Sequence, residues 1–121
     1  MIRFDQWWFP DGETQLPKWL ARMDLRVDGR LTYQHHKYAA ALQLVRHRRA
    51  AVDVGAHVGL WSYYMAQDFA AVEAFEPMDT HRACFLENVP SPHVRLHPVA
   101  LGVGYADVSL CTATAGCSGG T

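Results

Sequence analysis

The sequence has no apolar run long enough to cross a membrane, few cysteines and almost no net charge. A spanning helix needs about 20 consecutive apolar residues, and none occurs. The cysteines, at positions 84, 111 and 117, are odd in number and widely spaced, and they fit neither a disulfide framework nor a zinc site. Asp5 and Gln6 stand where a signal peptide has its apolar core. We therefore expect a reduced, cytoplasmic protein.

The charges nearly balance, with 11 Lys and Arg against 12 Asp and Glu for a formal net charge of −1. This balance gives no electrostatic reason to expect nucleic acid or an anionic membrane as a partner. The distribution is uneven, because residues 1–50 carry nine basic and five acidic groups while residues 51–121 carry two and seven. Three interpretations stay open: the two parts dock on each other, the acidic part holds a cationic ligand, or both are solvated faces.

Residues 1–49 predict a flap, a hairpin and a helix. Residues 1–23 are aromatic and interrupted by prolines, which predicts an irregular lid on the main body, with an aromatic partner-binding patch as the alternative. Asp28-Gly29 lies between two short apolar segments and predicts a tight hairpin. Apolar residues at helical spacing from Tyr38 to Val45 then predict a helix that ends near a cluster of arginines.

Residues 50–121 predict the main α/β domain. Short apolar segments alternate with segments of helical periodicity, in the order strand, helix, strand, helix, strand. The expected elements are strands over 50–54, 70–75 and 94–97, helices over about 59–68 and 80–89, and a further half-exposed strand over 106–112. This order is one half of a doubly wound Rossmann-like sheet. Its crossovers are right-handed, so the strands end at one shared edge, where a ligand is expected.

Three features follow the predicted strands at that edge. The loop over residues 53–59 contains Gly55 and Gly59, which let the backbone turn sharply and let a ligand approach closely. Glu76 ends the second strand 21 residues after Gly55, and a carboxylate there can accept hydrogen bonds from both ribose hydroxyls. Residues 98–102 follow the third strand and would offer small apolar groups to an adenine ring. Together these features predict a nucleoside ligand.

The glycine spacing indicates which nucleoside. A dinucleotide loop reads G-x-G-x-x-G, but this one reads G-x-x-x-G, so an NAD-dependent oxidoreductase is disfavoured and kept only as an alternative. No Gly-Lys-Ser/Thr follows, which excludes a phosphate-binding Walker loop. Asp53 adds a negative charge that would repel a pyrophosphate. A cationic nucleoside without phosphate fits better, and S-adenosylmethionine has a sulfonium, an ammonium and a ribose.

These motifs resemble the FkbM family of S-adenosylmethionine-dependent methyltransferases. The resemblance covers about residues 50–104, and the segments that carry it are residues 52–59, residues 74–77, Asn88 and residues 100–102. It implies a Rossmann-like, three-layer methyltransferase sheet, of which this chain holds a part preceded by the hairpin and helix. It also implies methyl transfer from S-adenosyl-L-methionine to the hydroxyl of a small-molecule or saccharide acceptor.

The resemblance also implies a role for individual residues. The expected cofactor-binding positions are Asp53, Gly55, Ala56, Gly59, Glu76, Pro77 and Ala100. Asp53 would lie near the methionine end, and Glu76 would hold the ribose diol. Pro77 and Ala100 would lie beside the adenine. His57 departs from the family, which often has asparagine there.

Other chemistry is not assigned from the sequence. No catalytic base is named. No metal is expected, because the adjacent His35 and His36 would point in different directions on a helix. His81, His93 and His97 are interpreted as surface or strand residues.

The family continues with a further strand and the acceptor pocket, so the chain is expected to hold about half of such a domain. The strand over 50–54 would then have an uncovered edge, which predicts a homo-oligomer or a partner chain that covers it. A non-catalytic nucleoside-binding or interaction module remains an alternative function.

Overall fold

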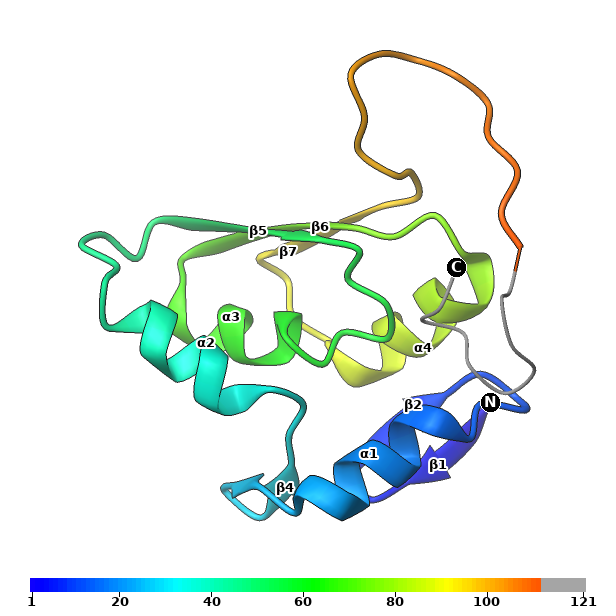
Figure 1. Cartoon of the computed structure of the whole chain (residues 1–121). Coiled ribbons are helices and arrows are strands. Elements are labelled where there is room, and N and C mark those ends of the chain that lie inside the picture. The colour runs from blue at the N-terminus through cyan, green and yellow to red at the C-terminus, as the bar shows by residue number, and fades with distance from the viewer. Residues whose placement is uncertain (112–121) are drawn as a thin grey trace.

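The computed structural model describes residues 1–111. Its elements are β1 (Ile2–Phe4), β2 (Trp7–Phe9), α1 (Gln15–Met23), β3 (Arg26–Val27), β4 (Arg30–Leu31), α2 (His35–Leu42), β5 (Ala50–Val54), α3 (Ser62–Asp68), β6 (Ala71–Phe75), α4 (Asp79–Asn88) and β7 (Val94–His97). Figure 1 shows the sheet of β5, β6 and β7 lying over α2, α3 and α4, with β1, β2 and α1 beyond them. The fold is thus mixed α/β.

The main sheet is parallel and three-stranded, with the order β5-β6-β7. Val54 is aligned with Phe75, and Phe75 with His97, so the three strands end together at one edge. The strands predicted over 50–54 and 94–97 are confirmed, and the strand between them begins one residue later than predicted. This sheet and the four helices are compatible with a partial Rossmann-like fold.

The strand predicted over 106–112 is wrong for residues 106–111, which have no regular structure; residue 112 and the glycine-rich tail lie outside the described part of the chain. Residues 98–111 leave the sheet as a loop (Figure 1). Alternation of polar and apolar residues makes a strand only where another strand pairs with it. Val108 and Leu110 lie exposed on this loop, and no strand within residues 1–111 pairs with them.

Residues 1–23 are not irregular, and that expectation is also wrong. β1 and β2 form an antiparallel hairpin, in which Asp5 has a positive φ of 56°. α1 follows, and the buried Glu13 carboxylate accepts hydrogen bonds from the backbone N–H groups of Gln15 and Leu16, both at 3.0 Å. These bonds satisfy donors that the first turn of a helix leaves without partners. The predicted Asp28-Gly29 hairpin is confirmed as β3 paired with β4.

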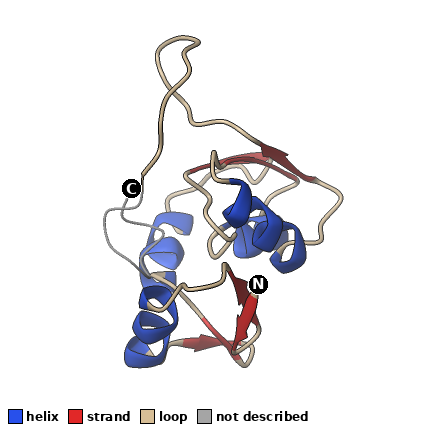
Figure 2. Ribbon diagram, turned by 90° about the vertical axis from the view of Figure 1, so that its right-hand side faces the viewer, coloured by secondary structure: helices blue, strands red, loops and turns tan. Residues whose placement is uncertain are grey.

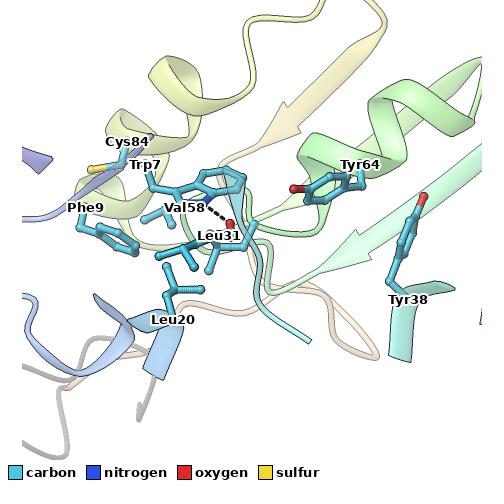
Figure 3. Packing of buried hydrophobic residues seen from close by; sticks show 9 residues of the cluster. Trp7, Phe9, Leu20, Leu31, Tyr38, Val58, Tyr64 and Cys84 are labelled. Atoms are coloured by element: carbon cyan, nitrogen blue, oxygen red, sulfur yellow. Dashed lines mark hydrogen bonds between the residues drawn. The ribbon is translucent and has the colours of Figure 1, made fainter. Parts of the chain in front are cut away.

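The aromatic N-terminal segment shares one hydrophobic core with the main sheet and its helices. Trp7, Phe9 and Leu20 are fully buried and cluster with Val58 from the loop after β5 (Figure 3). The Trp7 indole N–H donates to the carbonyl of Leu31 at 2.7 Å. Burial of a large apolar side chain contributes about 1.5–3 kcal/mol. The N-terminal segment is therefore packed tightly against the main sheet and its helices.

Asn88 connects the N-terminal segment to α4 and to the loop after β5 by hydrogen bonds. Its side-chain oxygen accepts from the backbone N–H of Trp8 at 2.8 Å, and its amide donates to the carbonyls of Trp8 at 3.0 Å and Val58 at 2.8 Å. The side chain is buried, so all three bonds are shielded from water. Asn88 thereby holds β2, α4 and the loop after β5 in one arrangement.

One face of the sheet is open, because the helices of the described residues lie on the other (Figure 2). Val52 and Val54 on β5 point to this face and are 56% and 61% exposed. Glu73 accepts a hydrogen bond from His97 at 2.6 Å on the same face. β5 is also an edge strand within the described residues, as expected for residues 50–54. An apolar edge strand is prone to pair with another strand.

We expect the chain to self-associate through β5. The double variant Val52→Lys/Val54→Lys is expected to reduce this association, because lysines on an edge strand oppose strand pairing. Light scattering on a concentration series measures the change. Leu86→Lys on α4 is the control, since Leu86 is 64% exposed and lies away from β5. A wild-type chain that stays monomeric at high concentration would contradict the prediction.

Candidate functional site

The loop after β5 has an unusual backbone. Gly55, His57 and Gly59 all have positive φ, at 75°, 55° and 94°. The Gly55 N–H donates to the carbonyl of Phe75 at 2.9 Å, which fixes the loop to the end of β6. A Cβ at Gly55 would meet no atom within 4 Å, whereas a Cβ at Gly59 would lie 2.6 Å from Cγ2 of Val89. Glycine at position 55 therefore allows the backbone to turn, and glycine at position 59 allows the loop to pack closely against α4 and Val89.

Glu76 directly follows β6, and its carboxylate is hydrogen-bonded to the loop after β5. Its Oε1 accepts from the His57 N–H at 2.8 Å, and its Oε2 accepts from the Met78 N–H at 2.9 Å. Burial raises the pKa of Glu76, but the His81 ring and the two N–H donors outweigh burial, and the pKa lies below its usual value. The group is therefore a carboxylate at neutral pH. A carboxylate can accept about four hydrogen bonds, so Glu76 can still accept from a ligand.

His81 lies beside Glu76 and is only 2% exposed. Its Nδ1 is 3.4 Å from Oε2 of Glu76, and within the described residues neither ring nitrogen has a hydrogen-bond partner. Its ring also contacts that of His57 in a tilted arrangement, with centroids 3.9 Å apart and an interplanar angle of 38°. The interpretation of His81 as a surface or strand residue is wrong, because the first turn of α4 directs it inward. Its position five residues after Glu76, at the start of the predicted helix, was the available signal.

A first cavity, of about 200 Å³, lies on one side of the loop. Its lining residues are Leu16, Tyr33, Asp53, Gly55, Ala56, His57, Leu60 and Trp61. Asp53 accepts a hydrogen bond from the Ser62 hydroxyl at 2.7 Å. Burial raises the pKa of Asp53, and the charge of Glu76 adds to this effect. Leu16 and Tyr33 belong to residues 1–49, and the other lining residues belong to the main α/β domain. This cavity therefore forms only where the two parts of the chain pack together.

A second cavity, of about 330 Å³, lies on the other side of the loop. Its lining residues are Val54, Gly55, His57, Glu76, Pro77, Met78, His81, Ala100, Leu101 and Leu110. Gly55 and His57 line both cavities. Every predicted cofactor-binding position except Gly59 lines one cavity or the other. No sequence pattern had placed Leu16, Trp61 or His81 at this site.

Residues 1–111 contain no group of three or more His, Cys, Asp or Glu side chains placed to hold a metal ion. Cys84 is buried, as expected, and Cys111 is exposed; both are free thiols, and Cys117 lies outside the described residues. No helix within residues 1–111 is long and apolar enough to span a membrane.

Comparison of the chain with protein-family models, with curated proteins and with solved structures gives no significant match. A functional proposal therefore depends on the motifs and on the geometry of the two cavities.

We expect Gly59→Ala to lower the free energy of unfolding by more than Gly55→Ala. Both substitutions strain a positive φ, at about 1–2 kcal/mol each. Only the Cβ at position 59 also overlaps Val89, which adds about 1–3 kcal/mol of overpacking. Urea denaturation of the two variants measures the difference. Equal destabilisation would show that Gly59 has no packing role.

His57 makes stability depend on pH. Burial, with a contribution from His81, lowers the pKa of His57 from 6.5 to about 4. The unfolded chain therefore binds a proton in this range that the folded chain does not, and the free energy of unfolding falls as pH drops through it.

We expect His57→Asn, which tolerates the positive φ, to remove up to about 3 kcal/mol of that dependence. Urea unfolding at several pH values measures it, with the exposed His36→Asn as the control. Identical pH profiles for wild type and His57→Asn would contradict this assignment.

Proposed function

We propose that the chain binds S-adenosylmethionine across the two cavities and forms part of a Rossmann-like methyltransferase that acts on a hydroxyl group. The observation that supports this proposal most directly is the Glu76 carboxylate. It ends β6, is buried beside the loop after β5, and keeps capacity to accept hydrogen bonds from two ribose hydroxyls.

The shape of the site fits an elongated nucleoside. Both cavities border the same loop at Gly55 and His57, so one elongated ligand that crosses this loop would place one end in each. Their volumes of about 200 and 330 Å³ together fall within the range of ligand pockets, about 300–1,000 Å³. The adenosine part would lie in the second cavity, against Pro77 and Ala100. The Nδ1 of His81 lies near Glu76, and its Nε2 would interact with a polar atom of the same group.

The charge of the site favours a cation and disfavours a diphosphate. Asp53 lines the first cavity and Glu76 the second, and the described lining of both contains no Lys or Arg. A pyrophosphate would meet two carboxylates without a compensating cation. An ammonium and a sulfonium would instead be attracted to Asp53. The aromatic rings of Tyr33 and Trp61 complete the first cavity and suit a cation as well.

The chain would promote transfer mainly by positioning. When bound, S-adenosylmethionine supplies an electrophilic methyl group on sulfur. Asp53 would hold the methionine end, Glu76 the ribose, and the loop between them would set the direction of the methyl group. Such orientation accounts for much of the rate of a two-substrate reaction. The apolar walls of Leu16 and Leu60 would exclude water, which favours a step in which charge is lost.

We expect isothermal calorimetry to detect binding of S-adenosylhomocysteine, and Glu76→Gln to weaken it at least about tenfold. The substitution removes a charge-assisted hydrogen bond worth about 1.5–3 kcal/mol. Glu73→Gln is the matched control, because Glu73 lies on β6, which Glu76 directly follows, but faces the open side of the sheet. Circular dichroism verifies that both variants are folded.

Two outcomes would reject the proposal. One is the absence of S-adenosylhomocysteine binding, and the other is equal binding by wild type and Glu76→Gln. Binding of NAD in a parallel titration would favour an oxidoreductase.

A further inference from the structure

A third cavity, of about 360 Å³, lies within the N-terminal part of the chain. Its lining residues are Trp19, Met23, Leu25, Thr32, Tyr33, Gln34, His36 and Lys37. They come from α1, from the β3–β4 hairpin and its flanks, and from the start of α2. Tyr33 also lines the first cavity, so the third cavity borders the first at this residue.

The wall of this cavity is apolar and accessible. Trp19, Met23 and Leu25 are 41%, 56% and 37% exposed. Single exposed apolar residues are common on protein surfaces, but a group of them around a cavity is typical of a ligand site. Trp19 and Met23 are four residues apart on α1 and therefore lie on the same face of the helix. That arrangement suits a flat, apolar ligand.

The polar groups at this cavity are cationic or neutral. Lys37 lines it, and the Arg22 guanidinium lies over the Trp19 ring, 5.4 Å from the centroid. The described lining contains no Asp or Glu. α2 begins at His35, and the positive end of its dipole adds to the same field. The cavity thus complements a ligand that has an apolar body and a negative group.

We propose that the third cavity binds the methyl acceptor, and that this acceptor is a small hydroxylated aromatic acid. The inference rests on the proposed function, because the acceptor must lie next to the methionine end of the first cavity. The ring would lie against Trp19 and Leu25, the carboxylate would pair with Lys37, and the hydroxyl would lie at the Tyr33 wall. A saccharide fits less well, since it needs more polar partners than this wall offers.

The reaction then balances without another reactant. The acceptor oxygen forms a bond to the methyl carbon while the carbon–sulfur bond breaks, and that bonding pair stays on sulfur. The hydroxyl proton is released to solvent. The products are a methyl ether and the neutral thioether. The acid group and the aromatic ring are unchanged.

Binding of para-hydroxybenzoate to the full chain tests this proposal. Calorimetry is expected to show binding to wild type, with phenol and methyl glucoside binding at least about tenfold more weakly. Lys37→Gln is expected to lose the preference for the acid over phenol, because it removes the charge that pairs with the carboxylate. The control is Lys18→Gln, an exposed lysine on α1 outside the cavity lining.

Separate titrations with S-adenosylhomocysteine distinguish the two proposals. Lys37→Gln is expected to keep S-adenosylhomocysteine binding, and Glu76→Gln is expected to keep para-hydroxybenzoate binding. If S-adenosylhomocysteine binds but the acid does not, the acceptor proposal is overturned and the proposed function stands. If the acid binds but S-adenosylhomocysteine does not, the third cavity is a ligand site and the methyltransferase proposal is overturned. Preferential binding of the glucoside overturns the aromatic acceptor.

Discussion

The Glu76 carboxylate determines the geometry of the candidate site. A buried charge requires hydrogen-bond donors, and here they are backbone N–H groups from two separate loops, one at His57 and one at Met78. His57 can present its N–H only because its backbone adopts a positive φ of 55° between two glycines with the same feature. The position of one carboxylate thus determines the conformation of the loop that lies between the first and second cavities.

The site also depends on a part of the chain far from it in sequence. Asn88 binds the backbone of both Trp8 and Val58, and Trp7 packs in the core beneath. This packing brings Tyr33 to the first cavity, which Asp53 also lines. The same N-terminal segment encloses the third cavity. The first cavity therefore borders both of the others, at Tyr33 and at the loop after β5, because two segments share a hydrophobic core.

Much of this arrangement could be predicted from residues that are close together in the chain. Short apolar segments predicted the strands of the main sheet, and Asp28-Gly29 predicted the separate β3–β4 hairpin, because periodicity and turn chemistry act over a few residues. The approach of Asp53 and Glu76 followed from topology, since parallel strands joined by right-handed crossovers end at one edge. A three-strand parallel sheet was therefore within reach of the sequence.

Other features arise only when distant segments pack. His81 was interpreted as a surface or strand residue, but α4 turns it against Glu76. Its position at the start of the predicted helix allowed this contact, but only the packing of α4 decides it. Gly59 was expected to form part of the loop beneath a ligand, but the nearest obstacle to a Cβ there is Val89, the residue that follows α4. The alternating residues 106–111 form no strand because a strand exists only where a neighbour pairs with it. Local chemistry in the chain is sufficient to define turns, strands and helices, whereas burial, pairing and the walls of cavities depend on contacts between residues that are distant in the sequence.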